Sequence, residues 1–147
     1  MKKLIYCLPL LLLLAACSKS ENKAAKEVSG SYQAQIHCHS YWVRNISEHG
    51  ESNTDYTASV QITNAGSGSI TVAYPDPSGG STNVILHLDQ NTADSLIYSN
   101  SSSYGQFDSD NARLRFGKAI KHFTFSHEKK YRVTSWNTIT YTIQGQP

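Results

Sequence analysis

Alternation of apolar and polar residues is the feature that most restricts how this chain can fold. From residue 31 to 42, every second residue belongs to a mostly apolar set, and its neighbours are polar. A period of two places the apolar set on one face of an extended strand, as expected for a half-buried antiparallel strand. The pattern recurs over residues 56–63 and 138–143, and sustained helical periodicity is missing from residues 30–147. We therefore predict an all-β, antiparallel domain.

Seven to nine short strands are expected, separated by turns rich in Ser, Asn, Gly and Asp. The predicted strands cover residues 31–42, 56–63, 70–74, 84–88, 96–98, 113–116, 120–125 and 138–143, with a further short strand at 131–133. They follow one another as a single antiparallel meander. A β-sandwich and a closed barrel produce the same one-face pattern, so both architectures stay open at this point.

The start of the chain has a different composition. Two lysines follow Met1, an apolar run covers residues 4–14, and two alanines precede Cys17. This is the build of a secretory signal, and the run is too short to cross a hydrocarbon layer of about 30 Å as a helix. We predict a signal peptide over residues 1–16.

Leu14-Ala15-Ala16-Cys17 resembles the lipobox of bacterial lipoproteins, in which the cysteine receives diacylglycerol and becomes the mature N-terminus. The resemblance implies that Cys17 carries fatty-acyl chains such as palmitate, which anchor a protein stably when two or more are present. Because Ser18 rather than Asp follows, it also implies sorting to the outer membrane. Residues 17–29 are then a lipidated cysteine and a flexible polar tether, ahead of a β-domain at 30–147.

Further residues extend this resemblance. Gly30-Ser31-Tyr32 opens the first predicted strand behind the tether, and a Thr- and Ser-rich region ends in a Tyr-bearing strand with Gly145. Over residues 30–145 the arrangement resembles the small lipocalin-like lipoproteins abundant in Bacteroidota. The resemblance implies a small β-barrel or barrel-like meander on an outer-membrane tether.

The three cysteines leave one free thiol. Cys7 belongs to the predicted signal peptide and Cys17 is predicted to be lipidated, so an internal disulfide is not expected and the domain must rely on its hydrophobic core. Cys38 falls on the apolar face of its strand, which favours a buried structural cysteine over a nucleophile.

Composition also limits the function. The formal charge of +2 comes from 13 basic and 11 acidic residues, and the two lysines of the leader account for the excess. A neutral mature chain argues against a nucleic-acid partner, because nucleic-acid binders carry a basic face. The patterns G-x-S-x-G, H-E-x-x-H, C-x-x-C and the phosphate loop do not occur in the sequence. We therefore expect a non-catalytic domain without a cofactor.

His37 and His39 form the sharpest local motif. Residues two apart on a strand point the same way, with backbones about 6–7 Å apart, and such a pair can chelate Zn or Cu. A third ligand could come from His49, His122 or His127. The alternative, which we favour, is that both histidines belong to a solvated polar face.

Charge is segregated along the chain. Residues 45–112 hold eight acidic side chains and no Lys or Arg, whereas residues 113–132 hold seven basic ones and a single acidic one. We favour internal compensation between neighbouring strands. The alternative is a surface for polyanionic glycans or lipid head groups, formed by Arg113, Arg115, Lys118, Lys121, Lys129 and Lys130.

These observations indicate an outer-membrane lipoprotein, attached to the membrane through Cys17, whose small non-catalytic β-domain binds an envelope component or a protein partner. Two alternative functions stay open. One is an inhibitor or immunity-type guard protein acting against a hydrolase or toxin. The other is metal binding in the envelope through His37 and His39.

Overall fold

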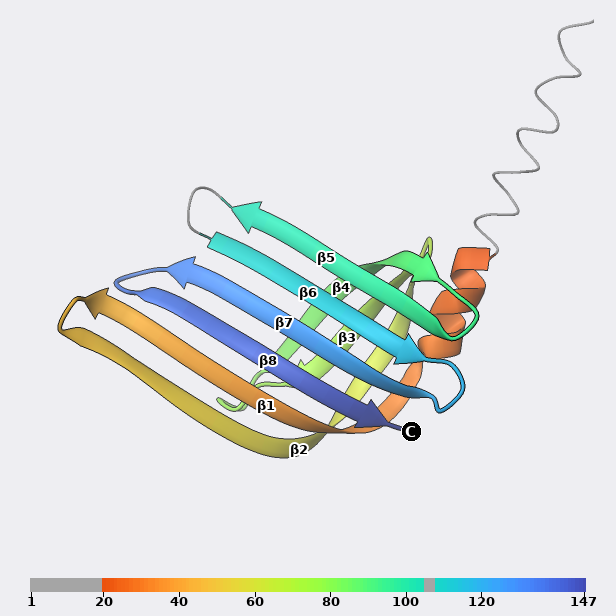
Figure 1. Ribbon diagram of the computed structural model, residues 1–147, viewed down its shortest axis with the longest axis horizontal. Coiled ribbons are helices and arrows are strands. Elements are labelled where there is room, and N and C mark those ends of the chain that lie inside the picture. Colours follow the sequence, from red (N-terminus) through yellow and green to blue (C-terminus); the bar gives the residue numbers. More distant parts are fainter. Residues whose placement is uncertain (1–19, 105–107) are drawn as a thin grey trace, which may run out of the picture.

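The computed structural model describes residues 20–104 and 108–147, so the predicted signal peptide and Cys17 lie outside the described residues. Eight antiparallel strands close into a barrel in chain order (Figure 1). They are β1 (Gly30–Asn45), β2 (Glu48–Gly66), β3 (Ser69–Pro75), β4 (Ser81–Asn91), β5 (Ser95–Tyr104), β6 (Asp108–Gly117), β7 (His122–Arg132) and β8 (Trp136–Gln146). Because β1 pairs with both β2 and β8, the fold is a closed barrel and not a sandwich.

The all-β prediction is confirmed, but several boundaries were wrong. β2 runs for 19 residues, whereas only residues 56–63 were expected to be a strand. Ile120 lies in the turn between β6 and β7, and Tyr131 belongs to β7 and not to a separate strand. The early part of β2 escaped prediction because its side chains are largely exposed, so the apolar alternation is absent there.

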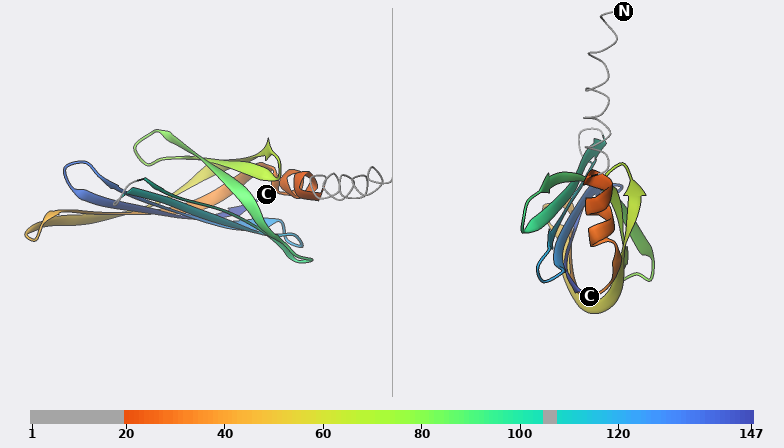
Figure 2. Two further views of the ribbon diagram at one scale, coloured as in Figure 1. Left: turned by 90° about the horizontal axis from the view of Figure 1, so that it is seen from above. Right: turned by 90° about the vertical axis from the view of Figure 1, so that its right-hand side faces the viewer.

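A short helix over residues 20–28 precedes β1 and closes one end of the barrel (Figures 1 and 2). Ala24, Ala25 and Val28 lie on one face of it and are buried in the barrel core. The Tyr32 hydroxyl donates a hydrogen bond of 2.7 Å to the Val28 carbonyl. The prediction of a flexible tether is therefore wrong for this segment, because one narrow apolar face suffices for a helix that covers a barrel end. Within the described residues, no helix is long and apolar enough to span a bilayer.

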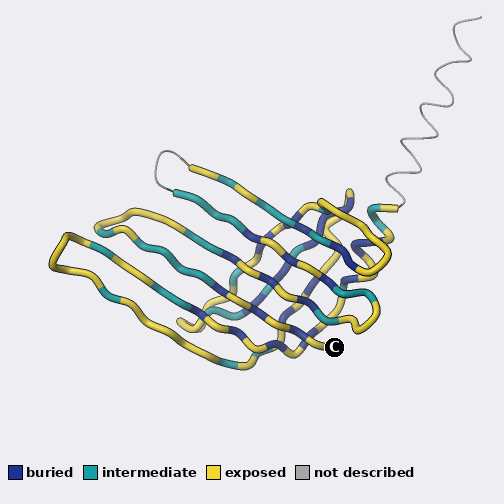
Figure 3. Tube along the Cα trace, in the orientation of Figure 1, coloured by how far each residue is buried: buried dark blue, intermediate teal, exposed yellow. Residues whose placement is uncertain are grey.

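Inward side chains form layers that run across the strands. At the closed end, one layer contains Ala34, Gly145, Phe123, Phe116 and Leu96, which are cross-strand neighbours. The next layer contains Ile36, Ile143, Phe125, Leu114 and Tyr98. All of these residues are buried, so the closed end carries the apolar core (Figure 3).

The barrel opens at its other end. β2 pairs with β3 only from Gln61 to Gly66, and β4 pairs with β5 only from His87 to Asn91. Beyond these points β5, β6, β7, β8, β1 and β2 continue past the β3–β4 hairpin as a curved sheet (Figure 2). We call this part, residues 40–54, 99–104, 108–111 and 128–140, the open end.

Candidate functional site

The inner face of the open end carries a row of aromatic and polar side chains. Trp42 pairs across the strands with Asn137, which in turn pairs with Tyr131, and Tyr104 pairs with Asp108. The three aromatic side chains are 39%, 37% and 68% exposed for Trp42, Tyr131 and Tyr104. Aromatic groups that would be covered in a core are thus presented to solvent here.

Further apolar side chains extend this surface to the hairpin tips. Ile46, in the β1–β2 turn, is 100% exposed, and Val133, in the β7–β8 turn, is 80% exposed. Tyr41 and Trp136 are exposed close to these turns, and the Arg132 guanidinium carbon lies 5.0 Å from the ring centroid of Trp136. Of the nine exposed large apolar residues in the described ranges, all except Ile85 and Ile120 lie at the open end. A cluster of exposed apolar side chains of this kind is typical of an interaction site.

The sequence did not identify this surface. The alternation in β1 assigns Trp42 to the buried face, and the other aromatic residues received no role. The signal that could have found them is the clustering of Trp and Tyr next to two predicted turns, where flanking strands run out of packing partners.

A buried polar network forms the floor of the open end. His127 on β7 is fully buried, with Nε2 2.7 Å from Asp110 Oδ1 on β6, and its Nδ1 bonds to the Tyr74 hydroxyl on β3. Burial lowers the pKa of His127 despite the neighbouring carboxylate. The neutral imidazole therefore donates a hydrogen bond from Nε2 to Asp110 and accepts one at Nδ1 from the Tyr74 hydroxyl. Burial also raises the pKa of Tyr74, so this hydroxyl keeps its proton.

A second set of contacts ties down the turn between β3 and β4. The Tyr141 hydroxyl donates to Asp76 Oδ2 at 2.7 Å, and the Ser78 hydroxyl and backbone N–H donate to Asp76 Oδ1 at 2.6 and 2.8 Å. The hydrogen bonds from Ser78 and Tyr141 hold the pKa of Asp76 below its usual value. The Tyr56 hydroxyl donates to the Pro75 carbonyl at 2.7 Å. The turn is thus attached to both β2 and β8.

Cys38 lies in the same layer as these polar groups. It is buried, as predicted, and burial raises the pKa of its thiol. A protonated, covered thiol is a packing group and a poor nucleophile.

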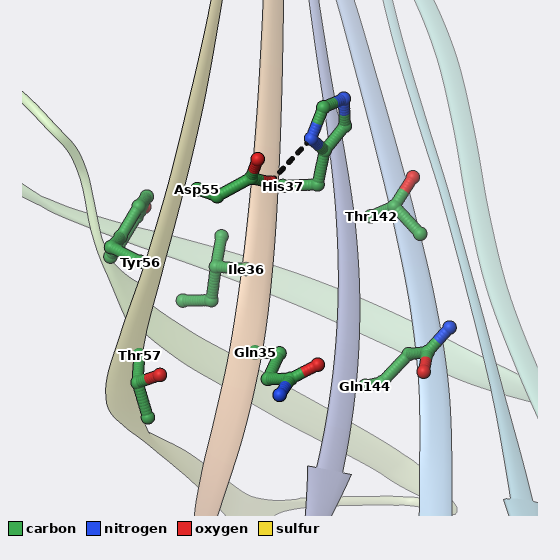
Figure 4. Close-up of a pocket in the computed structure, with 8 residues that line it drawn as sticks. All are labelled: Gln35, Ile36, His37, Asp55, Tyr56, Thr57, Thr142 and Gln144. Carbon is green, nitrogen blue, oxygen red and sulfur yellow. Dashed lines mark hydrogen bonds and ion pairs between the residues drawn. The ribbon is translucent and has the colours of Figure 1, made fainter.

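His37 and His39 lie on the outer face of β1, on the opposite side of the sheet from the network. His37 Nδ1 is 2.6 Å from Asp55 Oδ1, and His39 Nε2 is 3.6 Å from Glu51 Oε2. His37 and Asp55 line a shallow outer pocket of about 410 Å³ between β2, β1 and β8 (Figure 4).

The third ligands suggested for this pair lie elsewhere. His127 faces the interior, and His122 lies at the closed end. His49 pairs with Val43, four residues along β1 from His39, or about 13 Å away at the rise of a strand. Among the described residues, no group of three or more His, Cys, Asp or Glu side chains could hold a metal ion.

The six basic residues considered for anion binding are distributed over different surfaces. Arg113 and Arg115 lie on the outer face of β6, where they line a second shallow pocket. Lys118 donates to Asn91 Oδ1 and the Thr92 carbonyl at the closed end, at 2.8 and 2.7 Å. Lys121 lies in the same turn, between β6 and β7. At the opposite end, Lys129 and Lys130 are consecutive residues of β7 and therefore point to opposite faces of the sheet. These residues do not form one continuous surface.

The chain matches no known family model, and comparisons with curated proteins and with solved structures also give no match.

Proposed function

We propose that the protein is a lipid-anchored envelope protein, held at the outer membrane by acyl chains on Cys17, whose non-catalytic barrel binds an envelope component or a protein partner. The open end is the binding surface. The observation that carries this proposal is the gathering of seven exposed large apolar residues at that end: Tyr41, Trp42, Ile46, Tyr104, Tyr131, Val133 and Trp136. Trp and Tyr are enriched in the energetically dominant parts of interfaces.

The direction of the chain supports the same assignment. The helix of residues 20–28 enters at the closed end, and the open end lies at the far end of the strands (Figure 1). An anchor attached upstream of this helix leaves the open end unobstructed.

The buried network supports a structural role for the polar residues of the interior. Tyr74 and His127 are 1% and 0% exposed, so a substrate does not reach the hydroxyl or the imidazole in this conformation. Their hydrogen bonds join β3 to β6 and β7 across the barrel. The network thereby stiffens the floor beneath the binding surface.

The anchor is tested by metabolic labelling with radioactive palmitate followed by membrane fractionation. We expect label on the wild-type protein and on a Cys38→Ala variant, and none on Cys17→Ala, which should leave the membrane fraction. An unlabelled wild-type protein, or a Cys17→Ala variant that stays with the membrane in the wild-type amount, would remove the basis of the anchor.

The binding surface is tested by pull-down from envelope extract with the full lipidated chain. We expect Trp42→Ala/Trp136→Ala to lose a bound component that the wild type retains. The matched control, Ile85→Ala/Ile120→Ala, removes exposed apolar residues elsewhere and should retain it. Equal retention by all three proteins contradicts the proposal. A hydrolase or toxin retained in stoichiometric amount would assign the inhibitor function to the same surface.

A further inference from the structure

We infer that the open end binds an extended, cationic segment of a partner protein, which adds a strand to the free edge of β2. This inference rests on the proposed function and specifies the partner. β2 runs from Glu48 to Gly66, but it pairs with β3 only from Gln61 onward. Of the described strands, β1 alone pairs with residues 48–60, and their other edge forms the rim of the curved sheet at the open end (Figure 1).

This edge lacks the Lys and Pro residues that normally protect an exposed strand. In an antiparallel pair, every second residue directs its backbone N–H and C=O groups away from its partner strand, so residues 48–60 present a row of such groups. Soluble proteins usually block such a row with lysine or proline, or keep the strand short. β2 contains no Lys, Arg or Pro, and at 19 residues it is the longest described strand. A full strand is thus kept where one of its neighbours is absent.

The inner side of the free edge provides an apolar contact for an added strand. Trp42 pairs with Gly50, and a Cβ on Gly50 would lie 2.7 Å from the Trp42 indole. The indole therefore lies over the backbone of Gly50 and reaches toward the free edge. The next inward residues of β2, Ser52 and Thr54, are small and exposed. Since neighbouring strands lie about 4.8 Å apart, an apolar side chain of an added strand would fill this space and cover the ring.

The outer side of the same edge is acidic. Glu51 and Asp55 are exposed on one face of β2, four residues or about 13 Å apart. Their ion contacts are with His39 and His37 on β1, so with neutral histidines both carboxylates keep their negative charge. Opposite charges on neighbouring strands stabilise their pairing. The segment that fits this edge therefore carries basic side chains four positions apart on one face and apolar side chains on the other.

The basic residues of the open end lie away from these two carboxylates. Those of β7 are separated from β2 by β8 and β1, or about 14 Å along the sheet, and Lys130 is paired with Glu128 at 2.9 Å. Arg44 lies 3.6 Å from Glu48, at the tip of the β1–β2 hairpin. No Lys or Arg occurs between residues 45 and 112. A basic segment from a partner would thus supply the charge that this edge lacks.

A second copy of this chain fits the edge less well. Two β2 edges paired about a two-fold axis perpendicular to the sheet would bring the Glu51 and Asp55 side chains of both copies onto one face. β2 supplies no Lys or Arg to offset these four carboxylates, and like charges on paired strands are destabilising. The other free edge at the open end, Asn100–Tyr104 on β5, is shorter and holds no charged side chain.

Binding of synthetic peptides to the full lipidated protein in nonionic detergent tests the inference. The probe is a capped, fluorescein-labelled peptide of alternating Thr and Val, in which two Thr residues four positions apart are replaced by Lys. The matched peptide carries Glu in place of Lys. We expect the Lys peptide to bind, with a rise in fluorescence anisotropy, and the Glu peptide to bind roughly tenfold more weakly. Equal binding of the two peptides, or binding of neither, overturns the inference.

Variants of the protein provide the second arm. Glu51→Gln/Asp55→Asn keeps the size of both side chains and removes their charges. We expect it to weaken binding of the Lys peptide roughly two- to thirtyfold, because two opposite-charge pairs across neighbouring strands are lost. The matched control, Asp89→Asn/Asp94→Asn, removes two exposed charges at the connection between β4 and β5 and should leave binding unchanged. An equal loss in both variants contradicts binding at the β2 edge.

Backbone pairing is tested by methylating the peptide nitrogen atoms of either the Thr and Lys positions or the Val positions. Because the N–H groups of alternate residues point to the same edge of a strand, one of the two methylated peptides must lose binding. In the complex with the unmethylated Lys peptide, amide hydrogen exchange should slow at alternate residues of 48–60. Binding retained by both methylated peptides overturns strand addition, and so does unchanged exchange.

Failure of this inference can be told apart from failure of the proposed function. If the Lys peptide does not bind while Trp42→Ala/Trp136→Ala still loses its component in the pull-down, the partner does not use the β2 edge and the binding surface stands. If the pull-down is also unchanged, both assignments are overturned. A wild-type dimer in analytical ultracentrifugation that the Lys peptide does not dissociate would assign the edge to a second copy and overturn the inference.

Discussion

The two ends of the barrel share β1, β2 and β5–β8 but hold their aromatic side chains differently. At the closed end Phe123 and Phe116 are at most 1% exposed and pack beneath the N-terminal helix. At the open end, Trp42 on β1 and Tyr104 on β5 are 39% and 68% exposed. The apolar core and the proposed binding surface thus lie at opposite ends of the strands, so truncation at one end should have little effect on the other.

The boundary between the two regions coincides with the end of the β3–β4 hairpin. Tyr74, near the end of β3, bonds to His127, and Asp76, just after β3, accepts from Tyr141. Beyond this level β3 and β4 no longer cover the interior, which changes from apolar to polar. Paired polar groups tolerate that position, whereas an unpaired group would be costly.

The largest difference between the two ends is expected for aromatic truncation. Phe123→Ala removes a fully buried ring that packs edge to face with Tyr32, and it should lower the free energy of unfolding by about 3–5 kcal/mol. Tyr104→Ala at the open end should change it by less than about 0.5 kcal/mol. Urea denaturation measures both. Similar losses for the two variants would break the separation of the ends.

Two glycines provide a sharper version of the same comparison. A Cβ at Gly145 would lie 2.1 Å from the buried Phe123 ring, and one at Gly50 would lie 2.7 Å from the half-exposed Trp42 indole. Because Phe123 has no space into which it can move, Gly145→Ala should destabilise the protein by about 1–3 kcal/mol. Trp42 can swing toward solvent, so Gly50→Ala should have the smaller effect. Thermal unfolding measures the stability of both variants. A larger destabilisation by Gly50→Ala than by Gly145→Ala would contradict the view that the closed end is the more tightly packed one.

The sequence predicted the closed end better than the open end, for a physical reason. Alternation over residues 31–38 and 56–63 reports burial, and where burial occurs the predicted strands are confirmed. Barrel closure depends on pairing between β1 and β8, which involves residues about 100 positions apart and leaves no local pattern. The N-terminal helix was missed because its apolar face consists of only three small or medium residues.

The candidate site was harder to predict because exposure depends on a missing neighbour. Trp42 has the position and residue type of a core side chain, and it is exposed because β2 lacks a second partner before Gln61. His127 was considered only as a metal ligand. Its actual partners, Tyr74 and Asp110, are 53 and 17 residues away and come from other strands.

The buried polar residues at this boundary, His127 among them, should make the free energy of unfolding depend on pH. Burial lowers the pKa of His127 in the folded state, so the unfolded chain binds a proton more readily than the folded one. The stability that the neutral, buried His127 contributes is fully present above about pH 6.5, the pKa of the unfolded chain. It is lost as the pH falls toward the folded pKa, and the free energy of unfolding then changes by at most about 1.4 kcal/mol per pH unit.

Urea titrations between pH 7.5 and about pH 5 measure this slope. His127→Gln should flatten the profile, whereas His49→Gln, at an exposed position of the open end, should keep it. An unchanged profile in His127→Gln would show that His127 does not cause the loss of stability at low pH.

The smallest effect is expected for the exposed ion pair between β1 and β2 on the outer face of the barrel. His37 and Asp55 form a 2.6 Å contact, but their side chains are 47% and 79% exposed. Exposed ion pairs contribute little because water screens them, so Asp55→Asn should change the free energy of unfolding by less than about 1 kcal/mol. Metal analysis of protein purified without a His tag provides the companion measurement. Stoichiometric Zn or Cu, lost in a His37→Ala/His39→Ala variant, would assign the outer face a binding role and extend recognition beyond the open end.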